Sequence, residues 1–184
     1  MPPDPSAPAA GEPAPGEDEV DRVVGAWRRE RPDLDVSPME VLSRVTRLAR
    51  QLDRHRAEAF DAHGLEAWEF DVLAALRRAG VPYRASPGAL VRATGVTSGT
   101  MTNRVDRLAA RGLVERENDP ADRRGVLVRL TAAGRQLVDD ALVDLLAAER
   151  TLLETLPEPQ RATLAATLRR LLAPHDAVGG PQPG

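Results

Sequence analysis

Cysteine, lysine and isoleucine are absent from the 184 residues, and aromatic side chains make up only 3%. Without cysteine the chain cannot form disulfides, thiolate metal sites or a thiol-based redox sensor. Because every Lys/Arg position is Arg, the choice of Arg is no evidence of selection for bidentate contacts. The scarcity of aromatic residues, together with 42% hydrophobic residues, predicts one helical core packed mainly by Leu and Ala.

The sequence lacks the residues that several functional classes of protein need. The N-terminal stretch does not have the pattern of a secretory signal, and no apolar run approaches membrane-spanning length, so we expect a cytoplasmic protein. His55, His63 and His175 lack the spacing of metal ligands and are expected at the surface, with no metal or cofactor. No nucleophile and base pair or Gly-rich phosphate loop is recognisable, so we do not expect an enzyme.

Composition and hydrophobic spacing divide the chain into five segments. Residues 1–16 are rich in Pro, Ala, Gly and acid and are predicted to be a disordered tail. Residues 17–64 should form an extra helix, which Pro32 ends, and a dimerisation helix. Residues 65–131 should form the main domain, residues 132–173 further dimerisation helices, and residues 174–184 a second disordered tail.

Capping residues place the helices before residue 97. Ser37, followed by Pro38 and Glu40, reads as the cap of the dimerisation helix, and Gly64 closes it. A third helix over residues 65–78 should bury four side chains at helical spacing: Leu65, Trp68, Val72 and Leu76. A fourth helix should begin after Ser86 and stop at Gly95.

Residues 97–131 form the most informative stretch. Thr97 caps a short helix in which Met101, Val105 and Leu108 recur at positions i, i+4 and i+7 and predict a buried stripe. The opposite face carries short polar groups and Arg, which can approach base edges and phosphates. Taken alone, such a face can also be an ordinary solvated surface.

The residues after this helix predict a β-hairpin. Two β-prone runs, at Leu113 and Val114 and at residues 126–130, flank turn-forming residues. Arg123 and Arg124 lie at its tip beside Asp122, where a guanidinium could enter a minor groove. An Arg pair on a loop is usually just solvated, but its place directly behind a candidate recognition helix favours DNA binding.

Charge is distributed unevenly. The formal net charge of -3 opposes DNA binding by the chain as a whole. Residues 86–130, however, hold eight Arg and five acidic residues, whereas the N-terminal tail is acidic. The basic charge therefore coincides with the predicted helix and hairpin.

The C-terminal third predicts a dimer. Thr131 should cap a long helix with a heptad-like stripe comprising Val138, Leu142, Leu145, Ala148, Leu152 and Leu156. Pro157 and Pro159 should break it before a last helix over residues 160–172. These helices hold more Leu than a small core needs, so we expect a C2 homodimer, with packing inside one chain as the alternative.

The run GTMTNRVDRLAARGLVERENDPADRRGVLVRLT resembles the winged helix-turn-helix of the MarR family of bacterial regulators. The resemblance extends over about residues 37–172. It implies a mainly α fold with a small β-hairpin wing, and a homodimeric regulator, expected to be a repressor, that binds a palindromic DNA operator. The DNA-contacting residues it implies are Ser98, Thr100, Thr102, Asn103, Arg107, Arg123 and Arg124, with Asp122 supporting the wing.

A finer resemblance concerns control by a ligand. The extra helix with Trp27, and the runs RPDLDVSPM and EFDVLAALRRAG, resemble the urate-responsive PecS and HucR branch of the family. The likeness implies that Trp27 and Arg104 hold a planar anionic purine, and that Asp71 pairs with Arg116. Each residue also has a plainer interpretation: Trp27 as packing, Asp71 as half of a structural ion pair, and Arg104 as a phosphate contact.

The residues themselves suggest how such a ligand would act. Asp71, between Phe70 and Val72, is expected to be partly buried and to need a partner such as Arg116. An anion arriving beside Asp71 would repel it, loosen that link, and tilt the wing and recognition helix. Two alternatives stay open: an aromatic carboxylate or phenol as the ligand, or a winged helix that binds an acidic protein instead of DNA.

Overall fold

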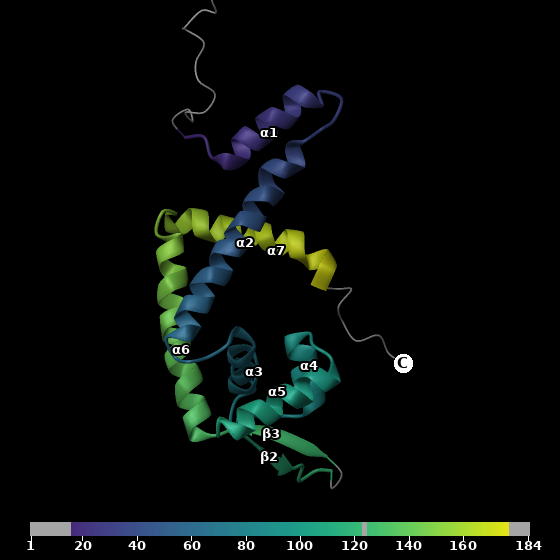
Figure 1. Ribbon diagram of the computed structural model, residues 1–184, viewed down its shortest axis with the longest axis vertical. Helices are drawn as coiled ribbons and strands as arrows, with labels where there is room; N and C mark the ends of the chain where they lie inside the picture. The colour runs from purple at the N-terminus through teal and green to yellow at the C-terminus, as the bar shows by residue number, and fades with distance from the viewer. Residues whose placement is uncertain (1–15, 123–124, 177–184) are drawn as a thin grey trace, which may run out of the picture. The chain divides into compact units, whose positions relative to one another are not determined.

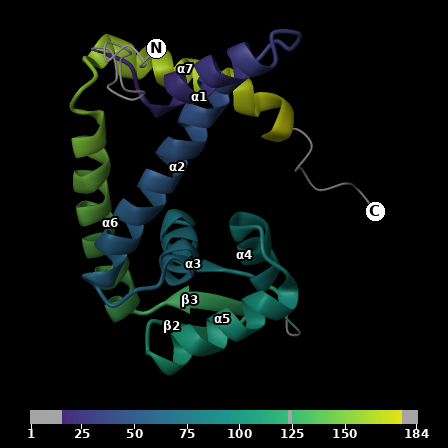
Figure 2. The same ribbon diagram turned by 45° about the horizontal axis from the view of Figure 1, so that its top comes forward.

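The computed structural model describes residues 16–122 and 125–176 (Figures 1 and 2). Arg123, Arg124 and most of both predicted tails lie outside the described residues. The chain divides into two units, Met1–Arg54 and His55–Gly184, and each is described by itself. None of the described helices is both long and apolar enough to cross a membrane.

The first unit contains α1 (Glu19–Glu30) and most of α2 (Ser37–Asp61). A small apolar cluster of Val20, Val24 and Val36 joins them, with Met39 packed against it. The extra helix is thus confirmed. Ser37 is the first helical residue and its N–H donates to Asp35, so the predicted cap at Ser37 is wrong by one residue.

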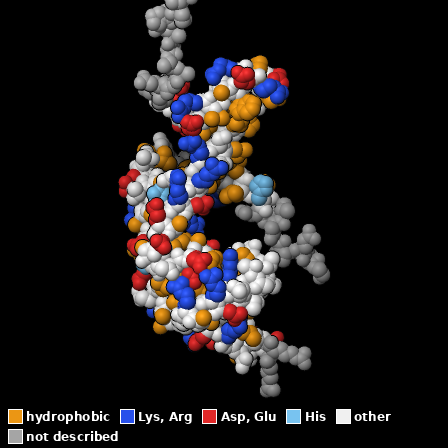
Figure 3. Space-filling view, in the orientation of Figure 1, with side chains coloured by type: hydrophobic (Ala, Val, Ile, Leu, Met, Phe, Trp, Pro, Cys, Tyr) orange, Lys and Arg blue, Asp and Glu red, His pale blue; other side chains and the backbone are white. Residues whose placement is uncertain are grey.

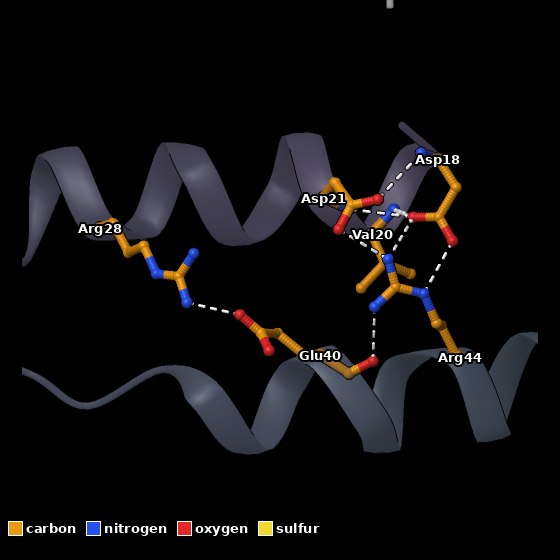
Figure 4. A network of polar contacts seen from close by, with 6 residues as sticks. All are labelled: Asp18, Val20, Asp21, Arg28, Glu40 and Arg44. Carbon is orange, nitrogen blue, oxygen red and sulfur yellow. Dashed lines mark hydrogen bonds and ion pairs between the residues drawn. The ribbon is translucent and has the colours of Figure 1, made fainter. Parts of the chain in front are cut away.

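A polar network joins α1 to α2 (Figure 4). The Arg44 guanidinium donates to Asp18 Oδ2 at 2.8 Å, to Asp21 Oδ1 at 2.7 Å and to the Glu40 carbonyl at 2.8 Å. Asp18 is also the N-cap of α1. The hydrogen bonds from Arg44, followed by the N–H of Asp21, lower the pKa of Asp18 to about 2. One arginine therefore fixes the start of the extra helix.

The second unit holds a winged helix followed by two long helices. In chain order its elements are α3 (Ala67–Arg78), β1 (Arg84–Ala85), α4 (Pro87–Thr94), α5 (Ser98–Ala110), β2 (Val114–Asn118), β3 (Val126–Leu130), α6 (Ala132–Leu153) and α7 (Glu158–Asp176). The strands form one antiparallel sheet in the order β1-β3-β2, with Val114 opposite Leu130 and Arg84 opposite Arg129. The two-residue strand β1 was not predicted, because it is too short to show alternation.

One apolar core lies under the winged helix. Phe60 stacks on Phe70 with ring centroids 4.3 Å apart, and buried side chains of α3 to α6 and of the sheet complete the cluster. The apolar stripe of Met101, Val105 and Leu108 on α5 is fully buried, as predicted. The predicted mainly α fold with a β-hairpin wing is confirmed.

The predicted caps in this unit are also confirmed. The side chains of Ser86, Thr97 and Thr131 accept backbone N–H groups at the starts of α4, α5 and α6. Gly95 ends α4 with φ of 69°, a left-handed conformation that favours glycine. These caps fix where the helix-turn-helix begins and ends.

The C-terminal helices differ from expectation at the ends of α7. Of the predicted heptad-like stripe on α6, Val138 and Leu145 are buried within one chain, whereas Leu142 is exposed. Helix α7 continues through Pro174 and His175, where the second tail was predicted to have begun. It begins at Glu158, before the predicted residue 160, because a proline such as Pro159 is tolerated in the first turn of a helix. Among the described α7 residues none is buried.

Candidate functional site

Helix α5 presents a polar face beside the wing, and Figure 2 shows α5 and β2 as neighbours. Because its apolar stripe is buried, Ser98, Thr100, Thr102, Asn103 and Arg107 are exposed, as the sequence predicted for a contacting face. Figure 3 shows basic and acidic side chains interleaved over the lower part of the view, where α3 to α5 lie.

The first turns of α5 are held by hydroxyl groups. Thr97 Oγ1 accepts the N–H of Thr100 at 3.3 Å and lies 2.9 Å from Thr100 Oγ1. Thr102 Oγ1 donates to the Ser98 carbonyl at 3.1 Å. The hydroxyl oxygens of Thr100 and Thr102 retain lone pairs that can accept further hydrogen bonds. No such internal bond is described for the exposed side chain of Asn103, which leaves its amide able to donate and accept at once.

Arg107 is fastened to the start of α3. Its Nη2 lies 2.6 Å from Glu66 Oε1, and its guanidinium lies 4.7 Å from the centroid of the Trp68 ring. Trp68 Nε1 donates to Glu66 Oε2 at 2.6 Å, and the Arg104 guanidinium also lies over the ring, at 5.3 Å. Hydrogen bonds from Trp68 and then Arg107 lower the pKa of Glu66. The predicted burial of Trp68 is therefore only partial, because its ring packs under two guanidinium groups.

A buried carboxylate holds the next turn of α5. Glu69 is buried, and its Oε2 accepts from Arg111 Nη1 at 2.6 Å and from the Glu66 N–H at 3.0 Å. Arg111 also donates to the Gly64 carbonyl at 3.0 Å. Sequence reasoning missed this pair, although Glu69 among the apolar residues of α3 is the signal that could have revealed it.

The wing is cross-linked by charges. Arg116 Nη2 on β2 lies 2.9 Å from Asp106 Oδ1 on α5. Glu117 accepts from Arg84 at 2.8 Å and from Arg129 at 3.1 Å, and these contacts, Arg84 first, lower the pKa of Glu117. The backbone carbonyl of Asp122 accepts a hydrogen bond from the Gly125 N–H at 2.8 Å. This contact lies within the turn that Asp122 was predicted to support.

Two predictions about Asp71 are wrong. Its carboxylate is 49% exposed rather than partly buried, because neighbours in a helix point about 100° apart and Phe70 and Val72 do not enclose it. It pairs with Arg56 at 3.6 Å, whereas Arg116 pairs with Asp106, so the expected Asp71–Arg116 pair is not formed. Trp27, in the first unit, is 47% exposed on α1.

The histidines also differ from expectation. His175 is exposed as predicted, but His55 and His63 are half-buried, and Nε2 of His63 lies 2.7 Å from Asp144 Oδ2 on α6. No group of His, Cys, Asp and Glu in the described part of the chain could hold a metal ion. The exposed polar side chains of α5 and the wing are hydroxyl, amide, guanidinium and carboxylate groups.

Known proteins are similar to this chain. The chain is 39% identical over 153 residues to the HTH-type transcriptional regulator PecS of Dickeya dadantii, covering 83% of this chain and 92% of the relative. The chain belongs to the MarR family. The profile of that family matches residues 63–125 of this MarR-family regulator, a range that includes α3 to β2. The likeness to PecS agrees with the branch that the sequence suggested.

Other relatives extend the comparison. The HTH-type transcriptional repressor NicR of Pseudomonas putida is 32% identical, covering 79% of this MarR-family chain and 93% of NicR. The crystal structure of a mutant MarR from E. coli complexed with operator DNA is 29% identical with a TM-score of 0.63, covering 76% and 99%. A structure of Bordetella bronchiseptica BpsR, whose DNA binding is regulated by 6-hydroxynicotinic acid, is 32% identical with a TM-score of 0.55, covering 69% and 91%.

Proposed function

We propose that this chain is a transcriptional repressor that binds a palindromic DNA operator as a homodimer. The observation that carries the proposal is the polar face of α5, which stays exposed beside the wing because the apolar stripe of the same helix is buried. Thr102, Asn103 and Arg107 on that face would read bases and contact phosphates. The similarity to MarR complexed with operator DNA supports the same use of α5.

The dimer is supported by apolar side chains that one chain leaves uncovered. They include Val41, Leu42, Val45 and Leu48 on α2 in the first unit, and Leu142, Val143, Leu146, Leu153, Leu164, Leu171 and Leu172 on α6 and α7 in the second unit. A second copy would remove such side chains from water. It would also supply a second α5, so that two recognition helices about 34 Å apart could read two half-sites.

DNA binding is tested by fluorescence anisotropy with a duplex from the region upstream of the chain's own gene. Affinity should fall linearly with the logarithm of salt concentration, with a slope of roughly -0.9 per phosphate contacted. A protein-interaction module with an acidic partner predicts no such binding to the duplex. Absence of salt-dependent binding would therefore remove the proposal.

We further propose that a small anionic ligand, urate or a related purine, releases the DNA. Four residues are assigned to this response by the resemblance to the PecS branch: Trp27, Asp71, Arg104 and Arg116. In the structure Arg104 packs on Trp68 and Arg116 joins the wing to α5, so a change at either residue would reach the DNA-contacting face. Arg104→Ala should blunt the response to urate, measured as the change in DNA affinity that urate causes in the variant compared with the change it causes in the parent.

An aromatic carboxylate is the second candidate ligand. It is favoured by the likeness to BpsR, whose DNA binding 6-hydroxynicotinic acid regulates. Urate, 6-hydroxynicotinate and salicylate, added separately to the protein–DNA complex and to a thermal-shift assay, distinguish the two classes. Release by urate alone supports the purine, and release by the aromatic acids alone replaces it.

A further inference from the structure

The carboxylate of Glu66 contacts Arg107, the cation that we propose contacts DNA. Glu66 precedes α3, and its two carboxylate oxygens receive different donors: Oε1 from Arg107 at 2.6 Å and Oε2 from Trp68 Nε1 at 2.6 Å. The Arg107 side chain thus extends from the polar face of α5 toward the start of α3. Both members of the pair are more than half exposed, so DNA phosphates can reach the same guanidinium.

We propose that the Glu66 carboxylate competes with DNA phosphate for the Arg107 guanidinium, and that this competition weakens the binding of DNA. The inference rests on the proposed DNA-binding function. A carboxylate and a phosphate oxygen need the same guanidinium donors, so binding one must displace or share the other. An acidic group beside the contact also repels the duplex. Glu66 is therefore a tuning residue that acts through Arg107.

The surroundings of the pair fit this role. Arg104 shares the ring of Trp68 with Arg107, so the indole remains covered by a cation when Arg107 turns away. Arg111, the C-cap of α5, is held separately by the buried Glu69. The end of α5 therefore keeps its own attachment to α3 when the Glu66–Arg107 contact is absent. The Trp68 N–H together with Arg107 lowers the pKa of Glu66 below its ordinary value. The competitor is a carboxylate at neutral pH, as an unperturbed glutamate would also be.

The test is a double-mutant cycle on the full chain. Glu66→Gln keeps an oxygen that can accept the Trp68 N–H but removes the charge. The same labelled upstream duplex is titrated with the parent, Glu66→Gln, Arg107→Gln and the double variant between about 50 and 200 mM salt. The thermal midpoint of each protein is measured alongside, to show that the fold is intact.

Glu154→Gln is the matched control. It removes the same charge from the C-cap of α6, outside α5 and the wing. Its DNA affinity should stay within about twofold of the parent, because salt screens the effect of an exposed charge that is not beside the contacted phosphates. A gain in DNA affinity that is larger for Glu66→Gln than for Glu154→Gln is then due to the position of the removed charge.

The expected result is DNA binding about threefold to tenfold tighter for Glu66→Gln, with a salt slope steeper by about 0.9, one additional phosphate contact. In the Arg107→Gln background the gain should shrink to that of the control. If the parent binds DNA, two results would overturn the proposed competition. One is an unchanged or weaker DNA affinity of Glu66→Gln, and the other is an equal gain in affinity from Glu66→Gln in the Arg107→Gln background. A parent that shows no salt-dependent DNA binding removes the proposed function itself, and the competition with it.

Discussion

Asp106 on the recognition helix and Arg116 on the first wing strand form an ion pair, with Oδ1 and Nη2 2.9 Å apart. Both side chains are about half exposed, so the pair adds at most about 1 kcal/mol to stability. Its larger effect is on charge. Arg116 covers a carboxylate that would otherwise stand alone on the exposed face of α5.

Arg116→Gln is expected to weaken DNA binding about threefold or more, because it removes a cation and uncovers Asp106. In an Asp106→Asn background the same substitution should cost less, since no carboxylate is left to uncover. Anisotropy titrations of the four proteins measure the difference. Equal losses in both backgrounds would show that Arg116 acts on DNA independently of Asp106.

Much of the second unit could be predicted because its signals are local. The spacing of Met101, Val105 and Leu108 and the caps at Thr97 and Thr131 fix helices from neighbouring residues alone. The same holds for the turn formers between β2 and β3. Local patterns therefore yielded the winged helix and the exposed face of α5.

The partners in the ion pairs of the site could not be predicted, because these pairs join residues on different elements. Asp71 was expected to pair with Arg116, but the packing of the elements gives each another partner. Glu66 and Glu69 lie about 40 residues before Arg107 and Arg111, which they hold. Choosing among 25 arginines and 28 acidic residues requires the tertiary arrangement, which no local pattern contains.

Gly134→Ala should destabilise the second unit strongly. A Cβ at Gly134 would lie 2.0 Å from the Leu113 carbonyl oxygen, which also accepts a hydrogen bond from Thr131 Oγ1. Because the obstructing atom is backbone, we expect a loss of about 3 kcal/mol. Urea unfolding measures it. The control is Gly99→Ala, where a Cβ meets nothing within 4 Å and helix propensity predicts a gain of up to about 1 kcal/mol.

Acid should release the extra helix. Arg44 lowers the pKa values of Asp18 and Asp21, so the carboxylates are more acidic when α1 is docked on α2. Their contribution to docking is complete at neutral pH and is lost as the pH falls from about 4, the unperturbed value, toward 2. Arg44→Gln should lose it at every pH.

Amide hydrogen exchange of α1, corrected for the intrinsic pH dependence of exchange, checks this. Protection in the parent should exceed that in Arg44→Gln at pH 7 and converge with it near pH 2. Arg29→Gln, on the last turn of α1, is the control, because no carboxylate partner is described for it. Equal protection of parent and Arg44→Gln at pH 7 would contradict the role of the network.

Leu171→Glu should dissociate the proposed homodimer. Leu171 is 50% exposed on α7, so a single chain loses little by the change, whereas a dimer would bury a charge. Sedimentation velocity should show monomer, with circular dichroism unchanged. Ala166→Glu, on the opposite side of α7 by helical spacing, should remain dimeric. A parent that sediments as a monomer would refute the dimer.

Asn103→Ala addresses the reading of DNA sequence. The side chain is exposed on α5 without a described internal partner, so its loss should change the free energy of unfolding by less than about 0.5 kcal/mol. An amide that reads one base contributes about 1 to 3 kcal/mol of discrimination. The variant should therefore bind the upstream duplex more weakly and tolerate all four bases at one position of each half-site. A panel of single-base variants measures this, and undiminished discrimination at every position would assign base reading to other residues of α5.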